Sequence, residues 1–207
     1  MTETTTVEVL LRRHGTTYAA DAGIEIADEP ASLWQLLVLT QLLSARISSE
    51  VAVAAARELF RAGYRTPRRM QAAPRRDRVS ALGRGHYRRY DERTATLLGE
   101  MADRVIDEYG GDLRGLRESG DIERDLQEFK GIGPAGAAIF CREVQGVWPE
   151  VAPYVDGLAA DGAERLGLPR SAERLADLVP AADLPRLVAA CVRAARHEDV
   201  VEDVRRA

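Results

Sequence analysis

The chain has 207 residues, 45% of them hydrophobic and 30% charged, and its formal net charge is −4 at pH 7. It can bury a real core, as one ordinary domain or two small lobes, but no apolar run approaches the roughly 20 residues that cross a bilayer. The N-terminus lacks the basic and apolar segments of a secretory signal, so we expect a cytoplasmic protein without membrane contact.

Helices are predicted along the whole chain, because Ala, Leu, Arg and Glu dominate and no sustained run of alternating β-branched residues occurs. We therefore expect an all-α fold. The predicted helices cover residues 7–14, 33–43, 50–61, a short piece between Pro67 and Pro74, 78–82, 89–109, 121–129, 135–144, 157–166, 171–178 and 182–196, with a connector over 15–31.

Local signals predict several helix ends. Ser32 is a good N-cap for the helix over 33–43, and Ser48 or Ser49 can cap the next helix. Gly110 follows the long helix and is suited to end it. The helix over 33–43 is apolar on nearly all sides, so we expect it at the centre of the core.

Basic residues concentrate in the middle of the chain. Residues 65–93 hold ten Arg against three acidic residues, whereas residues 1–30 hold six acidic residues and two Arg. The overall charge argues weakly against a nucleic-acid partner, but the local basic block favours one. A solvated helical face explains the same block equally well, and the sequence leaves both interpretations open.

Within this block, Tyr87 and Tyr90 lie among Arg84, Arg88 and Arg89. Aromatic side chains interleaved with arginines suit stacking on bases combined with contacts to phosphates. The alternative is that the two tyrosines pack in the core. We take the three arginines as candidate contacts to a nucleic-acid backbone.

The most informative segment is Phe129–Ala137, in which two glycines bracket Ile132 between two predicted helices. Glycines permit a tight turn with positive φ, and the second helix then begins with bare backbone N–H groups, which bind phosphate readily. This is the helix-hairpin-helix pattern, which grips a DNA backbone without reading bases, although an ordinary interhelical turn is the alternative. The predicted DNA contacts are Lys130, Gly131, Ile132, Gly133, Ala135 and Gly136.

Two further segments flank the hairpin in a fixed order: Leu42-Leu43-Ser44-Ala45-Arg46 upstream and Val155-Asp156-Gly157 downstream. Together the three segments resemble the HhH-GPD superfamily of DNA glycosylases, and endonuclease III in particular, over about Leu33 to Leu168. The family patterns are Leu-Leu-Ser-Ala-Gln, Leu-Pro-Gly-Val-Gly-Arg-Lys-Thr-Ala and Val-Asp-Thr. The resemblance implies two all-α lobes: a helical barrel over 31–147, with the hairpin at about 121–145, and a second lobe of 1–30 plus 148–207.

The resemblance also implies a reaction. The family's catalytic lysine is replaced by Ala135, and alanine cannot form the Schiff base that permits strand cleavage. A monofunctional DNA N-glycosylase of base-excision repair is implied, with Asp156 supporting attack by water on the glycosidic bond of a flipped base. A plain helix N-cap is the alternative for Asp156. Lys130, the only lysine, is expected to face phosphate rather than the sugar.

Three more residues are assigned through the resemblance. Arg46 replaces a glutamine that, in relatives, enters the space left by the extruded base, and an arginine can fill that gap and bond the orphaned partner base. A phosphate contact or a surface salt bridge is its alternative. Trp148 and Tyr154 flank the proposed site and are candidates for lining a base pocket. Residues 33–49 hold no acidic residue, whereas adenine-specific relatives have a glutamate there, so adenine excision from mismatches is not expected.

The chain has two cysteines, Cys141 and Cys191, which cannot supply the four ligands of the family's iron–sulfur cluster. We expect both to be buried reduced thiols and expect no cofactor; a monovalent cation at the hairpin is left open. The expected partner is double-stranded DNA with a damaged base. A non-catalytic binder of damaged DNA, and a helical interaction protein that no longer binds DNA, are the alternatives.

Overall fold

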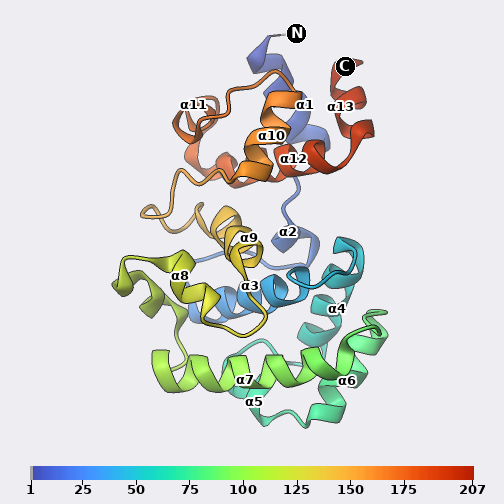
Figure 1. Ribbon diagram of the computed structural model, residues 1–207, viewed down its shortest axis with the longest axis vertical. Helices are drawn as coiled ribbons and strands as arrows, with labels where there is room; N and C mark the ends of the chain where they lie inside the picture. The colour runs from blue at the N-terminus through green and yellow to red at the C-terminus, as the bar shows by residue number, and fades with distance from the viewer. Residues whose placement is uncertain (1) are drawn as a thin grey trace. The chain divides into compact units, whose positions relative to one another are not determined.

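The computed structural model describes residues 2–207, and these residues contain helices but no strand (Figure 1). The all-α prediction is therefore confirmed for this part of the chain. The helices are α1 (Glu3–Arg13), α2 (Tyr18–Asp21), α3 (Pro30–Leu43), α4 (Ser49–Arg61), α5 (Pro67–Ala72), α6 (Arg75–Arg84), α7 (Asp91–Tyr109), η1 (Leu113–Ser119), α8 (Ile122–Gln127), α9 (Pro134–Val144), α10 (Gly157–Arg165), α11 (Ala172–Ala176), η2 (Ala181–Asp183), α12 (Leu184–Arg196) and α13 (Glu198–Arg205).

These helices form two compact units. The internal unit is Ala19–Phe140, and the terminal unit combines the chain up to Tyr18 with Cys141–Ala207. Helix α9 carries the chain from the first unit into the second. None of the helices in residues 2–207 has the length and hydropathy that a membrane-spanning segment requires.

The unit boundaries differ from those expected, which lay at 30/31 and 147/148. Residues 19–30 belong with the internal unit because side chains of α3 and α4 hold them. The hydroxyl of Ser32 donates to the carbonyl of Glu25 at 2.8 Å, and Arg57 donates to the carbonyl of Asp21. The connector expected over 15–31 therefore includes a short helix, α2, and three of its apolar residues, Ala19, Ala22 and Ile24, are buried.

Helix α3 is the centre of the internal unit, as its all-round apolar sequence predicted. Every residue from Ser32 to Leu42 is buried. The predicted N-cap at Ser32 is wrong, because Pro30 occupies the first turn and the helix begins three residues earlier, after Glu29. The hydroxyl of Ser32 is instead used within the first turn to fix the preceding segment.

Helices α4, α7 and η1 of the internal unit contact α3. Helix α4 begins at the predicted cap, where Ser48 accepts a hydrogen bond from the backbone N–H of Val51 at 3.4 Å. Helix α7 ends at the predicted Gly110, whose φ of +63° lies in the left-handed region. Helices α5 and α6 pack against α7 (Figure 1).

The terminal unit is built on the contact between α10 and α12, with α1 and α13 packed beside α12 (Figure 1). The two central helices approach closely at Gly162, where an added Cβ would lie 1.8 Å from the backbone oxygen of Cys191. Helix α13 was not predicted, because its charged sequence resembles a polar tail. Its valines, Val200, Val201 and Val204, are buried and hold one face of the helix against the unit.

Candidate functional site

The predicted hairpin lies between α8 and α9, in the turn over 128–133. Gly131 has a φ of +91°, a conformation that favours glycine, and Ile132 is only 3% exposed. The turn therefore has the predicted positive φ at Gly131 but not at Gly133, and the isoleucine fills the angle between the helices.

The hairpin is seated on the last turn of α3, within the internal unit. A Cβ added at Gly136 would lie 2.3 Å from Oγ of Ser44, and a Cβ added at Gly131 would lie 2.5 Å from Nε2 of Gln41. Gly136 therefore allows the close approach to Ser44, and Gly131 is favoured chiefly by its positive φ, because the flexible end of Gln41 can move aside. The hairpin therefore packs directly against the upstream segment that contains Ser44. This contact explains why the two segments occur together in the sequence pattern.

This packing gives a testable double substitution. Gly136→Ala is expected to destabilise the protein by about 1–3 kcal/mol, because the new methyl group overlaps the Ser44 hydroxyl. Ser44→Ala removes that hydroxyl, so the double variant should recover most of the loss. Urea unfolding of the wild type, both single variants and the double variant measures the coupling. If the two substitutions had strictly additive effects on the free energy of unfolding, the contact between residues 136 and 44 would be contradicted.

The first turn of α9 exposes backbone donors. Gly133 and Ala135 are exposed, and neither backbone N–H has an acceptor among residues 2–207. Pro134 has no N–H to satisfy, which suits the first position of a helix. Lys130 projects to the surface, with Nζ 3.0 Å from Oε2 of Glu100. The turn thus offers free amides at the positive end of the α9 dipole.

The arginine block is divided between structural and unpaired residues. Arg84 donates to Oε2 of Glu58 at 3.1 Å, and this hydrogen bond, assisted by Arg61, lowers the pKa of the Glu58 carboxyl. Arg88 and Arg89 are exposed and form no ion pair within the described chain. These last two residues are therefore the better candidates for phosphate contacts.

The two tyrosines of the block have different environments. Tyr87 is fully buried, so the core-packing alternative holds for it, and burial raises the pKa of its phenol. Tyr90 is half-buried, and the guanidinium carbon of Arg89 lies 5.3 Å from the centre of its ring. Arg46 is exposed in the loop that follows α3. Thus Tyr90 and Arg46 are accessible to a ligand, whereas the ring of Tyr87 is mostly enclosed.

Asp156 is the N-cap of α10 in the terminal unit, accepting a hydrogen bond from the backbone N–H of Ala159 at 3.1 Å. Nη1 of Arg142 lies 3.4 and 3.3 Å from the two carboxylate oxygens. The Asp156 side chain is 21% exposed, and that of Arg142 only 9%. The capping role predicted as an alternative is therefore confirmed. Some carboxylate surface is still open to a ligand.

Arg142 was not identified from the sequence, and neither was Gln145. The carboxamide of Gln145 binds both backbone groups of Tyr154, accepting from its N–H at 2.8 Å and donating to its carbonyl at 3.1 Å. The available signal was the polar residues Arg142 and Glu143 at the end of the otherwise apolar α9, with Gln145 directly after it. Together the side chains of Arg142 and Gln145 fix the loop that leads to Asp156.

The two aromatic residues proposed for a base pocket differ in exposure. Trp148 is 0% exposed, which contradicts its predicted role, because a ring without exposed atoms cannot stack on a base. Trp148 is instead one of the largest fully buried side chains of the protein. Tyr154 is half-buried, with its backbone held by Gln145.

Cys141 and Cys191 are both buried, as expected, and desolvation raises the pKa of the Cys191 thiol to about 12. Two buried cysteines do not fit a four-thiolate iron–sulfur cluster. Within residues 2–207, no three side chains of His, Cys, Asp or Glu gather in a way that could hold a metal ion.

The two units and the hairpin define the class of fold. It is an all-α fold of two units with a helix-hairpin-helix, as the sequence predicted, and it is similar to the fold of endonuclease III. No family model matches the sequence, and neither does any curated protein.

The particular similarities are to solved structures of endonuclease III. A non-covalent endonuclease III–DNA complex has a TM-score of 0.51 and 18% sequence identity to this chain. A trapped endonuclease III–DNA covalent intermediate, described as an estranged-adenine complex, has a TM-score of 0.48 and 19% identity. Each likeness covers 93% of this chain and 86% of the other. The similarity in fold is taken from the non-covalent complex, which has the higher TM-score.

Proposed function

We propose that this chain is a monofunctional DNA N-glycosylase of base-excision repair, which binds double-stranded DNA at a damaged base. The observation that carries the proposal is the endonuclease III-like fold combined with an aspartate at the head of α10 and an alanine, Ala135, at the lysine position of the hairpin. The solved neighbour is itself a DNA complex.

In the proposed reaction the exposed amides around Gly133 hold a DNA phosphate, and the damaged nucleotide is flipped out of the stack. The Asp156 carboxylate stabilises positive charge that develops on the sugar as the glycosidic bond breaks. Water adds to the sugar carbon and loses a proton, which leaves the free base and an abasic site. Ala135 offers no amine, so the strand stays intact, and no cofactor takes part.

The test uses duplexes that each carry one lesion: uracil, an oxidised pyrimidine, 8-oxoguanine or an alkylated purine. The protein is incubated with each duplex, and abasic products are cleaved with alkali. A monofunctional enzyme gives strand breaks only after alkali treatment. Direct nicking without alkali would contradict the assignment of Ala135 and point to an amine such as Lys130.

A second function is supported by the contacts of Asp156. Its carboxylate already caps α10 and pairs with Arg142, so a structural role accounts for the residue without any reaction. A non-catalytic binder of damaged DNA would have the same contacts. Such a protein would bind lesion duplexes in preference to intact ones and release no base from any of them.

The DNA-binding part of the proposal predicts a steep salt dependence. Replacing Arg88 and Arg89 together by alanine should reduce the slope of log Kd against log salt concentration by about 2, one for each lost phosphate contact. Fluorescence anisotropy with a labelled duplex at several salt concentrations measures the slope.

The matched control is Arg170→Ala, because Arg170 is already neutralised by Asp161 and Glu164 at 2.8 and 2.6 Å. Its slope should equal that of the wild type. Equal slopes for the control and the Arg88/Arg89 double variant would exclude Arg88 and Arg89 from the DNA interface. A wild type that binds no duplex at any salt concentration would favour the helical interaction protein.

A further inference from the structure

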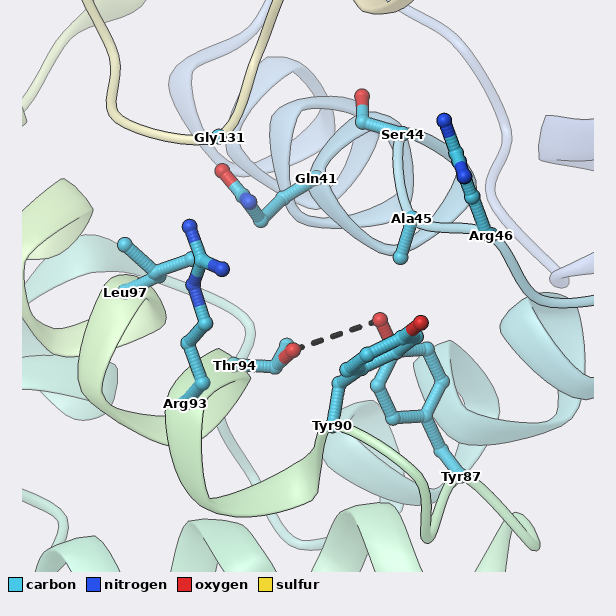
Figure 2. A pocket seen from close by; sticks show the side chains of 10 residues that line it. All are labelled: Gln41, Ser44, Ala45, Arg46, Tyr87, Tyr90, Arg93, Thr94, Leu97 and Gly131. Carbon is cyan, nitrogen blue, oxygen red and sulfur yellow. Dashed lines mark hydrogen bonds between the residues drawn. The ribbon is translucent and has the colours of Figure 1, made fainter.

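A pocket of about 230 Å³ lies entirely within the internal unit. It is enclosed by the end of α3 and the loop after it, the start of α7 and the hairpin turn at Gly131 (Figure 2). Its lining residues include none of those assigned to the reaction at Asp156. The pocket therefore needs an explanation of its own.

The wall formed by α3 contains a polar group with no partner. Gln41 is 4% exposed, and its Oε1 is buried without a hydrogen bond. On the same helix Gln35 is satisfied, since it donates to the carbonyl of Ala31 at 2.9 Å and accepts from Arg65 at 3.4 Å, whereas Oγ1 of Thr40 is also buried without a partner. Burying an unpaired carboxamide destabilises a fold, so a residue kept in this state needs a reason other than stability.

The remaining walls suit a flat ring with polar edges. Tyr90 presents an aromatic face, and Leu97 and Ala45 add apolar surface (Figure 2). Tyr87 also borders the pocket, and its buried phenol oxygen accepts a hydrogen bond from Oγ1 of Thr94 at 3.4 Å. Aromatic and apolar walls with a few convergent polar atoms are typical of a small-molecule or base site.

The rim of the pocket is positive. Arg46 and Arg93 are exposed lining residues, and neither forms an ion pair within the described chain. Figure 2 shows their side chains rising from opposite sides of the pocket, Arg93 from α7 and Arg46 from the loop after α3. Two free guanidinium groups at the mouth favour a ligand whose ring enters while its phosphates stay outside.

We propose that this pocket binds a single unstacked nucleobase of DNA and that Gln41 reads its edge. The carboxamide supplies one donor and one acceptor, which matches a base edge with a donor and an acceptor side by side. The terminal torsion of a glutamine is broad, so the amide can turn either atom toward the ligand. This inference rests on the proposed DNA binding, but it does not require base excision at Asp156.

The test compares two duplexes that differ only in whether a base is present to enter the pocket. One carries 2-aminopurine opposite a tetrahydrofuran abasic analogue, and the other carries tetrahydrofuran on both strands. The wild type should bind the 2-aminopurine duplex about tenfold more tightly, the scale of one good bidentate base contact. Gln41→Leu should abolish this preference while leaving the affinity for the base-free duplex unchanged.

Gln35→Leu is the matched control, because it makes the same chemical change on the same helix at a satisfied residue. It should retain the preference for the 2-aminopurine duplex. Thermal unfolding gives a second readout: Gln41→Leu should raise Tm by about 2–4 °C, since it removes an unpaired buried group, whereas Gln35→Leu should lower Tm.

Each result has a defined meaning. A tenfold preference lost in the Gln41 variant and kept in the Gln35 variant supports the inference. Equal affinities of the wild type for the two duplexes, or a preference that survives Gln41→Leu, would overturn it while the proposed DNA binding stands. Failure of the wild type to bind either duplex would overturn both proposals together.

Discussion

Asp156→Asn is expected to slow base release by about 10²–10³-fold, the scale on which one electrostatic stabiliser acts in a transition state, while DNA binding is retained. Asparagine is as good an N-cap as aspartate, so α10 keeps its hydrogen bond from Ala159. The amide oxygen can still accept from Arg142. The substitution thus removes the negative charge and leaves the local structure in place.

The measurement is single-turnover base release from whichever lesion duplex the wild type cleaves, with anisotropy to confirm binding. Asp112→Asn is the matched control. Asp112 also caps a helix, η1, and also pairs with an arginine, Arg114, at 2.6 Å, and this contact lowers the pKa of its carboxyl. The control should release base at the wild-type rate. An Asp156→Asn variant that is equally fast would exclude the carboxylate from the reaction.

Gly162→Ala is expected to cost about 3 kcal/mol or more of unfolding free energy, the largest effect on stability that we predict. The added Cβ would lie 1.8 Å from the backbone oxygen of Cys191, where no side-chain rotation can relieve the overlap. Helices α10 and α12 would have to separate, and Asp156 at the head of α10 would move with them.

Gly157→Ala is the control on the same helix, because nothing lies within 4 Å of its added Cβ. This variant should be neutral or up to about 1 kcal/mol more stable, since alanine loses less backbone entropy on folding. Urea unfolding of the two variants gives the comparison. A Gly162→Ala protein as stable as Gly157→Ala would show that α10 and α12 are not in close contact.

The amino-acid sequence by itself determined the features that depend on neighbours in the chain. The cap at Ser48, the left-handed glycine after α7, the glycine turn around Ile132 and the position of Asp156 at the head of α10 were all predictable, because each is a local interaction over a few residues. The central place of α3 followed from its apolar sequence on all sides.

Only the tertiary structure decided which residues from distant segments meet. It buried Trp148, paired Arg142 with Asp156 and left Oε1 of Gln41 without a partner beside the hairpin. It also assigned residues 19–30 to the internal unit. Periodicity gives the face of a helix that is apolar but not the surface that the face contacts, and burial, ion pairing and pocket shape depend on that contact.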